Sequence, residues 1–225
     1  MQQISEEEIY LNELNNENDW NDLSTNYKLS ESIMEEFANK IRWDRISYTQ
    51  KLSENFMEKF KNKVNWNSIS VYQDLSESVI ERFKDKVNWD YVSEWQTLSE
   101  PFIEKYQDMV NWGWISQNQK LSEPFIRKFE NRVNWHYISM RQKLSEQFIK
   151  EFADKVDWNH ISQRQKLSEP FIEEFQDMIN WSLISYYQKL SEMFIKKHKD
   201  KVDWENISYS QNLSKSFKEE FKKKL

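Results

Sequence analysis

Histidines are the first candidates for chemistry in this chain, because imidazole binds transition metals and transfers protons near neutral pH. His136 lies one residue after Trp135 and His160 lies two residues after Trp158, so equivalent helices could bring the two rings together. A metal site there would also need a carboxylate ligand and an ordered second shell. We interpret both as unrelated surface residues and His198 as a partly buried replacement for a core aromatic ring. We predict no metal and no cofactor.

Serine side chains are candidate nucleophiles and recur at two fixed positions, represented by Ser53 and Ser70. A catalytic site needs different groups that converge on one point. The same serine in every repeat instead indicates helix caps and hydrogen bonds between helices. The chain has no cysteine, which excludes thiol nucleophiles and disulfides, and its single glycine, Gly113, excludes a glycine-rich phosphate loop. We predict that the protein is not an enzyme.

The bulk composition narrows the possible partners and compartments. The net charge of −6 gives no electrostatic footprint for nucleic acid, although a local basic patch stays possible. Aromatic residues make up 16% of the chain, which argues against disorder. The acidic amino-terminal sequence lacks the apolar core of a signal peptide, and no stretch approaches the roughly 20 apolar residues of a membrane helix. We expect a soluble cytoplasmic protein with no membrane partner.

Tryptophan shows how these residues are positioned, because it recurs at a constant interval of 23 residues without insertion. A fixed period of this length is typical of repeat architectures, in which each repeat buries its apolar face against its neighbours. The period predicts a single elongated array over residues 20–225. The series comprises Trp20, Trp43, Trp66, Trp89, Trp112, Trp135, Trp158, Trp181 and Trp204.

Each repeat begins with the signals for a helix. Ser53 is a good N-cap and precedes an apolar helical stripe that runs from Phe56 to Val64. All the prolines of the sequence fall in the first turn of this helix, where a missing N–H costs little. They are Pro101, Pro124 and Pro170.

A second, shorter helix follows in each repeat. Asn65 is a suitable N-cap, and Trp66, Ile69 and Gln73 form a helical stripe that we expect to face the core. The alternation of apolar and polar residues that is typical of strands is absent. We therefore predict an all-α protein, an α-solenoid of about nine two-helix repeats of 23 residues.

The two ends of the chain depart from the repeat as terminal caps do. Residues 1–19 predict an N-terminal capping helix that starts with a capping box of Ser5 and Glu8. Near the other end, Lys218 replaces the isoleucine or methionine of the core, which suits a face that no further repeat covers. We expect an array that is complete at both ends.

The repeat motif LSExFIxxFxDxVxWxxISxxQK is almost unbroken at Leu167–Lys189. It resembles tandem repeats of uncharacterised proteins from bacteriophages and large DNA viruses, and the resemblance extends from about Trp20 to the end. The family pattern carries no catalytic residues. The resemblance implies a viral or phage origin and a role in engaging host proteins.

The third, sixth and seventh positions of the shorter helix lie opposite the predicted core stripe and vary between repeats. They are rich in Tyr, Trp and Arg, which dominate binding hot spots. We predict an aromatic ridge that binds a partner; the alternative is that these rings pack against the next repeat, which predicts less varied positions. The predicted partner-binding residues are Tyr72, Tyr91, Trp95, Trp114, Tyr137, Arg141, His160, Arg164 and Tyr187.

Two functional hypotheses follow from these positions. The first is a binding protein that blocks or redirects a host protein, for example a component of host defence. The second is a reader of single-stranded nucleic acid, in which one base per repeat stacks on rings such as Tyr91 and Trp95 while Arg141 assists. The acidity of the chain disfavours the second, because phosphate contacts supply most of such affinity. A host or cellular protein is therefore the predicted partner.

Overall fold

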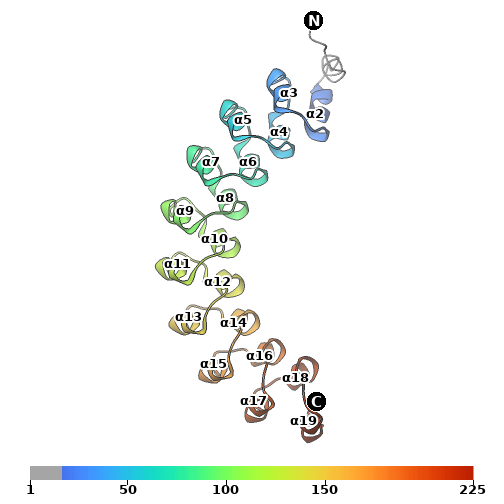
Figure 1. The fold of residues 1–225 in the computed structure, drawn as a ribbon, viewed down its shortest axis with the longest axis vertical. Helices are drawn as coiled ribbons and strands as arrows, with labels where there is room; N and C mark the ends of the chain where they lie inside the picture. The colour runs from blue at the N-terminus through green and yellow to red at the C-terminus, as the bar shows by residue number, and fades with distance from the viewer. Residues whose placement is uncertain (1–16, 225) are drawn as a thin grey trace. The chain divides into compact units, whose positions relative to one another are not determined.

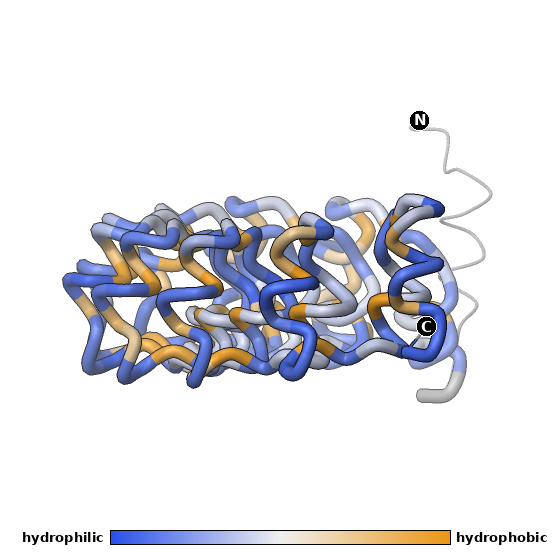
Figure 2. Tube along the Cα trace, turned by 90° about the horizontal axis from the view of Figure 1, so that it is seen from below, coloured by the Kyte–Doolittle hydropathy of each residue, from blue (hydrophilic) through white to orange (hydrophobic). Residues whose placement is uncertain are grey.

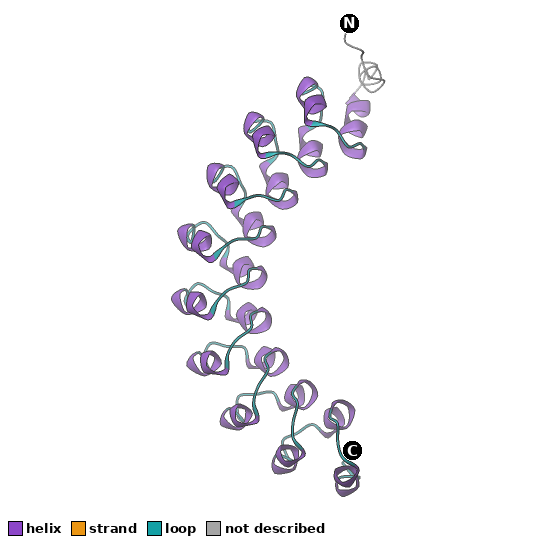
Figure 3. Ribbon diagram, in the orientation of Figure 1, coloured by secondary structure: helices purple, strands orange, loops and turns teal. Residues whose placement is uncertain are grey.

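The computed structural model describes residues 17–224, and these form helices, turns and loops without a strand (Figure 3). The predicted all-α solenoid of repeated helix pairs is confirmed for this part of the chain. The chain divides into two compact units, residues 1–111 and 112–225, which are described separately as the first and second unit.

The helices of the first unit are α2 (Glu17–Asn26), α3 (Glu31–Glu36), α4 (Trp43–Thr49), α5 (Glu54–Lys59), α6 (Trp66–Tyr72), α7 (Glu77–Arg82), α8 (Trp89–Trp95) and α9 (Glu100–Lys105). Those of the second unit are α10 (Trp112–Asn118), α11 (Glu123–Lys128), α12 (Trp135–Arg141), α13 (Glu146–Glu151), α14 (Trp158–Arg164), α15 (Glu169–Glu174), α16 (Trp181–Tyr187), α17 (Glu192–Lys197), α18 (Trp204–Ser210) and α19 (Lys215–Glu220).

Within each unit the six-residue helices and the seven-residue helices form separate rows (Figure 1). In the first unit α3, α5, α7 and α9 form one row, while α4, α6 and α8 form the other and pack in succession. In the second unit α10, α12, α14, α16 and α18 pack in succession in the same way. The seven-residue helices therefore make the closest helix–helix contacts of both units.

Side-chain caps begin both kinds of helix, as the sequence predicts. Ser53 Oγ accepts a hydrogen bond from the backbone N–H of Phe56 at 3.2 Å at the start of α5. Asn65 Oδ1 accepts one from the backbone N–H of Ser68 at 3.1 Å at the start of α6. Proline lies in the first turn of α9, α11 and α15. These caps satisfy N–H groups that have no partner inside the helix.

The first helix of each repeat is shorter than the sequence predicts. Helix α5 ends at Lys59 after six residues, whereas α6 has seven. Phe60 leaves the helical region, with φ −109° and ψ 24°. The chain then makes a tight turn in which the N–H groups of Lys63 and Val64 donate to the Phe60 carbonyl at 2.8 and 3.1 Å. The apolar stripe continues through this turn, so its periodicity indicated one longer helix.

The core of each repeat is centred on isoleucine rather than on tryptophan. Ile69 and Ser70 are fully buried, whereas Trp66 is half-buried. The indole N–H of Trp66 donates to the Lys61 carbonyl at 2.8 Å, and its ring lies 4.5 Å from Phe83 of the following repeat. The sequence predicts that Trp66 faces the core together with Ile69 and Gln73. Trp20 is buried, whereas Trp66 and its later equivalents are half-buried and cover the edge of the core, where the Trp66 indole N–H bonds to a carbonyl in the preceding turn.

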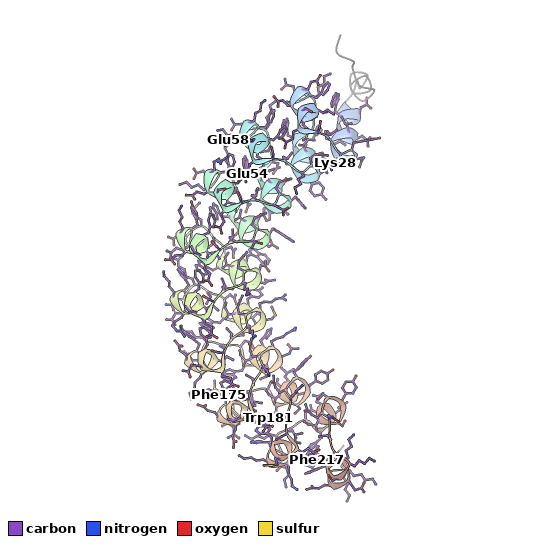
Figure 4. The ribbon with its side chains drawn as sticks, viewed as in Figure 1. Lys28, Glu54, Glu58, Phe175, Trp181 and Phe217 are labelled. Carbon is purple, nitrogen blue, oxygen red and sulfur yellow. The ribbon has the colours of Figure 1, made fainter. Side chains whose placement is uncertain are left out.

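The same ring packing joins successive repeats of the second unit. Figure 4 shows Phe175 and Trp181 between the two rows of helices. The ring of Trp158 stacks on Phe175 with centroids 5.0 Å apart, and that of Trp181 stacks on Phe194 at 6.3 Å. Lys201 Nζ lies 5.8 Å from the Trp181 ring, so a cation covers its outer face. Each tryptophan thus fastens its own repeat to the next.

Buried serines of the seven-residue helices bond to the helix that follows in the row. Ser70 Oγ donates to the Trp66 carbonyl at 2.7 Å and accepts from the Asn88 N–H at 3.0 Å. In the second unit, Ser139 Oγ accepts from the Asp157 N–H at 2.9 Å. These bonds satisfy a hydroxyl that would be costly to bury unpaired. The predicted hydrogen bonds between helices are confirmed.

Within each unit, a glutamine that follows a seven-residue helix bonds to the backbone of the preceding repeat. Gln73 Oε1 accepts from the Leu52 N–H at 3.0 Å, and Gln73 Nε2 donates to the Gln50 carbonyl at 2.7 Å. Gln165 makes the same pair of bonds in the second unit, at 3.0 and 2.8 Å. The carboxamide is suited to this place because it carries a donor and an acceptor side by side.

Polar contacts also join successive six-residue helices at the surface. Ser76 Oγ donates to Glu54 at 2.9 Å in the first unit. Arg127 and Glu151 form a pair of hydrogen bonds at 2.7 Å in the second, and Arg127 thereby lowers the pKa of the Glu151 carboxyl. Exposed pairs of this kind contribute little stability individually. These contacts join neighbouring six-residue helices, whereas the buried core supplies most of their stability.

The sequence predicts that both ends of the chain depart from the repeat. The capping box of Ser5 and Glu8 lies outside the described residues, so the capping helix over residues 1–19 stays a prediction there. Helix α2 begins at Glu17. Lys218 in α19 is exposed, as the sequence predicts.

Hydrophobic stretches along the chain are short and alternate with hydrophilic ones (Figure 2). This pattern is typical of helices that bury one face against a neighbour. Among the described residues, no helix has the length and hydrophobicity that would let it cross a membrane.

Candidate partner-binding surface

The candidate surface comprises the third, sixth and seventh positions of the seven-residue helices, counted from the tryptophan. The fourth and fifth positions, such as Ile69 and Ser70, are fully buried against the neighbouring helices. Because a helix advances about 100° per residue, the sixth and seventh positions turn away from that contact. This places the variable residues at the surface of the row.

The seventh position is exposed in most repeats and carries the best candidates. Tyr72 and Trp95 keep 56% and 59% of their surface in the first unit. In the second unit Arg141, Arg164 and Tyr187 are exposed. Large exposed side chains that recur on one face of a row can form a contiguous apolar patch, which is typical of an interaction surface. The predicted set is therefore most accessible at this position.

The third position is less accessible than the prediction requires. Tyr91 is exposed, whereas Trp114, Tyr137 and His160 are half-buried. The side chain at the third position lies against the residue at the second position of the preceding seven-residue helix. In one such pair Asn206 Nδ2 donates to Ser182 Oγ at 2.9 Å, across α16 and α18.

The sixth position contributes three exposed tyrosines that are absent from the predicted binding set. The rings of Tyr48 and Tyr72 meet edge to face with centroids 4.4 Å apart in the first unit. In the second, Tyr186 lies 4.7 Å from Tyr187 and 6.0 Å from Tyr209. The sequence already places tyrosine at these positions, but the ring contacts depend on the spacing of neighbouring helices. Such aromatic clusters present large area at low entropic cost.

Trp95 also borders a depression in the surface of the first unit. The depression lies between the ends of α6 and α8 and has polar and apolar walls. It is lined by Asp74, Leu75, Ser76, Trp95, Gln96 and Thr97. A concave surface beside an exposed indole offers a partner both a ring to cover and a recess to fill.

The exposed rings do not form one unbroken ridge. The seventh position of α10, α12 and α14 holds Asn118, Arg141 and Arg164, and these side chains are exposed. Aromatic groups thus occur around Tyr72 and Trp95 in the first unit and around Tyr187 in the second. Guanidinium groups occupy part of the second unit's surface, where they can pair with carboxylates.

The two neighbouring histidines are not unrelated surface residues, contrary to our interpretation of the sequence. The ring centroids of His136 and His160 lie 4.5 Å apart, and Asp157 lies beside both. Burial opposes ionisation of Asp157. Hydrogen bonds from His136 and from the backbone N–H groups of His160 and Asn159 outweigh it, so the pKa of the Asp157 carboxyl is lowered. His198 is buried beside Phe194, in agreement with its interpretation as a spacer.

Comparison of the chain with protein-family models, curated proteins and solved structures finds no match. The resemblance of the repeat motif to viral and phage repeats therefore stays a prediction.

Proposed function

We propose that the protein is a non-catalytic scaffold that binds a partner protein through the sixth and seventh positions of its seven-residue helices, here termed the binding face. The observation that carries this proposal is the exposure of Tyr72 and Trp95, which keep more than half of their surface while adjacent positions are fully buried. Tyrosine and tryptophan are among the residues that contribute most when they are covered by a partner.

The rigidity of the rows favours binding. Gln73 and Ser70 bond α6 to the helices before and after it in the row, so the exposed Tyr72 ring is held on a preorganised frame. A surface that is ordered before association loses less entropy when the partner docks. The pairing of Tyr48 with Tyr72 restricts both rings further.

The partner's chemistry follows from the two kinds of side chain on the binding face. Tyr72 and Trp95 would pack into apolar recesses of the partner, whereas Arg141 and Arg164 would pair with its carboxylates. A protein surface offers both, whereas the net charge of −6 over the whole chain disfavours binding to a nucleic-acid backbone. In keeping with the resemblance of the motif to viral and phage repeats, we propose that the partner is a host protein.

The serine positions support a non-catalytic role. Ser70 Oγ is buried and bonded to the backbone of its own helix and of the next one. Ser53 Oγ caps α5. Both hydroxyls are thus engaged in hydrogen bonds that hold helices.

Affinity capture with the intact chain tests the proposal. Proteins are captured from host lysate and compared quantitatively between the unmodified chain, the double variant Tyr72→Ser and Trp95→Ser, and the control Met109→Ser. Met109 is also exposed but lies in the turn after α9. We expect the double variant to lose a specific partner by about 30-fold or more, as hot-spot residues do. Equal capture by the three proteins would contradict the proposal.

A second measurement separates protein binding from nucleic-acid binding. Single-stranded oligonucleotides are titrated at low and high salt, because phosphate contacts make affinity fall steeply as salt rises. We expect no binding at low salt. Salt-dependent binding that is lost on Arg141→Ser and Arg164→Ser would replace the scaffold proposal by a nucleic-acid reader.

A further inference from the structure

Three potential metal ligands meet between α12 and α14 of the second unit. His136 lies on α12, Asp157 caps α14, and His160 lies in the first turn of α14. Asp157 Oδ2 is 3.0 Å from His136 Nδ1 and 3.6 Å from His160 Nδ1. Ligand atoms of the three side chains lie within 4.8 Å of one another. The juxtaposition comes from the packing of successive helices, which brings the second position of one beside the third position of the next.

The two oxygens of Asp157 have different neighbours. Oδ1 accepts hydrogen bonds from the backbone N–H groups of Asn159 at 3.0 Å and His160 at 3.3 Å, as an N-cap does. This pair of bonds fixes the plane of the carboxylate and directs Oδ2 toward the two imidazoles. Ordered outer bonds of this kind orient the ligands of metal sites.

His160 presents a nitrogen that the protein does not otherwise satisfy. Its Nδ1 atom is buried, and among the described residues it has no hydrogen-bond partner. A buried polar atom without a partner is costly, and a metal ion is one of the groups that can remove that cost. His136 is half exposed and lies on the solvent side of the cluster, so its ring can adjust to an incoming ion.

The spacing fits a divalent transition metal. Zinc binds histidine nitrogen and carboxylate oxygen at about 2.0–2.1 Å, so two ligands of a tetrahedral site stand about 3.3 Å apart. The two measured distances from Asp157 Oδ2, 3.0 and 3.6 Å, lie on either side of that value. Imidazole and carboxylate together suit zinc, nickel and copper, whereas magnesium and calcium prefer oxygen ligands alone.

We propose that His136, Asp157 and His160 bind one divalent transition-metal ion, with zinc as the expected occupant. The ion joins α12 to α14 and so braces two successive repeats of the second unit. With three protein ligands it keeps a fourth coordination position for water or for a partner's side chain. The site is independent of the proposed binding face, because it uses the second and third helix positions.

The chain contains its own control for this site. Ser182, Asp203 and Asn206 occupy the equivalent places between α16 and α18. Ser182 Oγ donates to Asp203 Oδ2 at 2.9 Å, and the backbone N–H of Asn206 donates to Asp203 Oδ1 at 3.1 Å. The carboxylate has the same orientation there, but the two imidazoles are replaced by a hydroxyl and an amide. The fold therefore tolerates both sets of side chains.

Titration calorimetry of the chelator-treated intact chain with zinc chloride tests the proposal, and thermal unfolding with and without zinc gives a second readout. We expect one zinc ion per chain and a rise in melting temperature that magnesium does not produce. The double variant His136→Ser and His160→Asn copies the arrangement at Asp203, so it should fold. We expect it to bind zinc at least about tenfold more weakly and to lose the thermal shift.

The reciprocal variant Ser182→His with Asn206→His asks whether the geometry is sufficient. We expect it to bind two zinc ions per chain instead of one. His198→Phe is the control for the remaining histidine and should bind zinc as the unmodified chain does. Absence of zinc binding, zinc binding that survives the His136 and His160 substitutions, or one ion shared by two chains would each overturn the proposal.

Discussion

Residues 1–111 contain 12 basic and 22 acidic side chains, whereas residues 112–225 contain 20 and 16, so the net charge changes from −10 to +4. The frameworks of the two units are nevertheless alike. Gln73 in the first unit and Gln165 in the second make the same two bonds to the preceding repeat. Their buried isoleucines occupy the same positions.

The difference between the units lies at the exposed positions. The seventh position holds Tyr72 and Trp95 in the first unit, and Arg141, Arg164 and Tyr187 in the second. Because the framework uses other positions, these side chains can change without a cost in packing. The repeat thus separates the residues that stabilise the fold from those that vary at the surface, and under the proposed function each unit would contact a different part of a partner.

The largest expected effect tests whether the two frameworks are equivalent. Ile69→Ala in α6 and Ile161→Ala in α14 each empty a fully buried site. We expect each to destabilise its unit by about 2–5 kcal/mol, because a core cavity is added to the lost transfer energy. Hydrogen exchange with mass spectrometry should show the loss of protection in the substituted unit first. Losses that differ between the units by more than the spread of that range would show unequal frameworks.

A smaller effect is expected from the glutamine bonds. Gln165→Met keeps the volume but leaves the Leu144 N–H and the Gln142 carbonyl without their partner. We expect a loss of about 1–3 kcal/mol in urea unfolding, the cost of unpaired buried groups. Gln73→Met should cost the same in the first unit, whereas the half-buried Gln163→Met is the control and should change stability little. A neutral result at both buried glutamines would mean that apolar packing alone orders the repeats.

The smallest effect sharpens a difference inside the cores. His198 replaces the phenylalanine of the repeat in the second unit, and burial lowers its pKa, an effect that Glu173 opposes and Lys197 and Lys201 reinforce. The unfolded chain therefore takes up a proton first, so stability is full above about pH 6.5 and falls below it. We expect His198→Phe to gain about 1 kcal/mol near neutral pH, and more at pH 5.5.

Tyr106→Phe is the matched control for this change. Tyr106 holds the same position of the repeat in the first unit and is also buried. The Tyr106→Phe substitution removes no imidazole, so its effect on melting temperature should be the same at pH 5.5 and pH 8. A gain for His198→Phe that does not depend on pH would show that the imidazole stays uncharged in both states.

The sequence predicts the helix pairs, both kinds of cap and the burial of Ile69 and Gln73, because each depends on spacing within one repeat. It fails where a property depends on the distance between neighbouring helices. The half-burial of Tyr137 and the meeting of His136 with His160 come from contacts between the second position of one helix and the third of the next. The spacing of residues within one repeat does not predict contacts between neighbouring helices.

The features of the candidate surface also divide into those that the sequence predicts and those that it does not. The exposure of Trp95 follows from its place opposite Ile69-type residues and was open to prediction. The edge-to-face pair of Tyr48 and Tyr72 was not, because its members lie on different helices. Helix length was misjudged for a related reason, since the turn after Phe60 continues the apolar pattern of α5.

The glutamine bonds also constrain how this polypeptide can change in length. The carboxamides of Gln73 in the first unit and Gln165 in the second both bond to main-chain groups 21 and 23 residues upstream. Gaining or losing a single amino acid inside a repeat would change the spacing of the bonds that span it and take the carboxamide out of register with its two main-chain partners. Duplicating or deleting a whole 23-residue block would leave all of them matched. We therefore expect the gene to change in length by whole repeats, which agrees with the constant 23-residue spacing of the tryptophans.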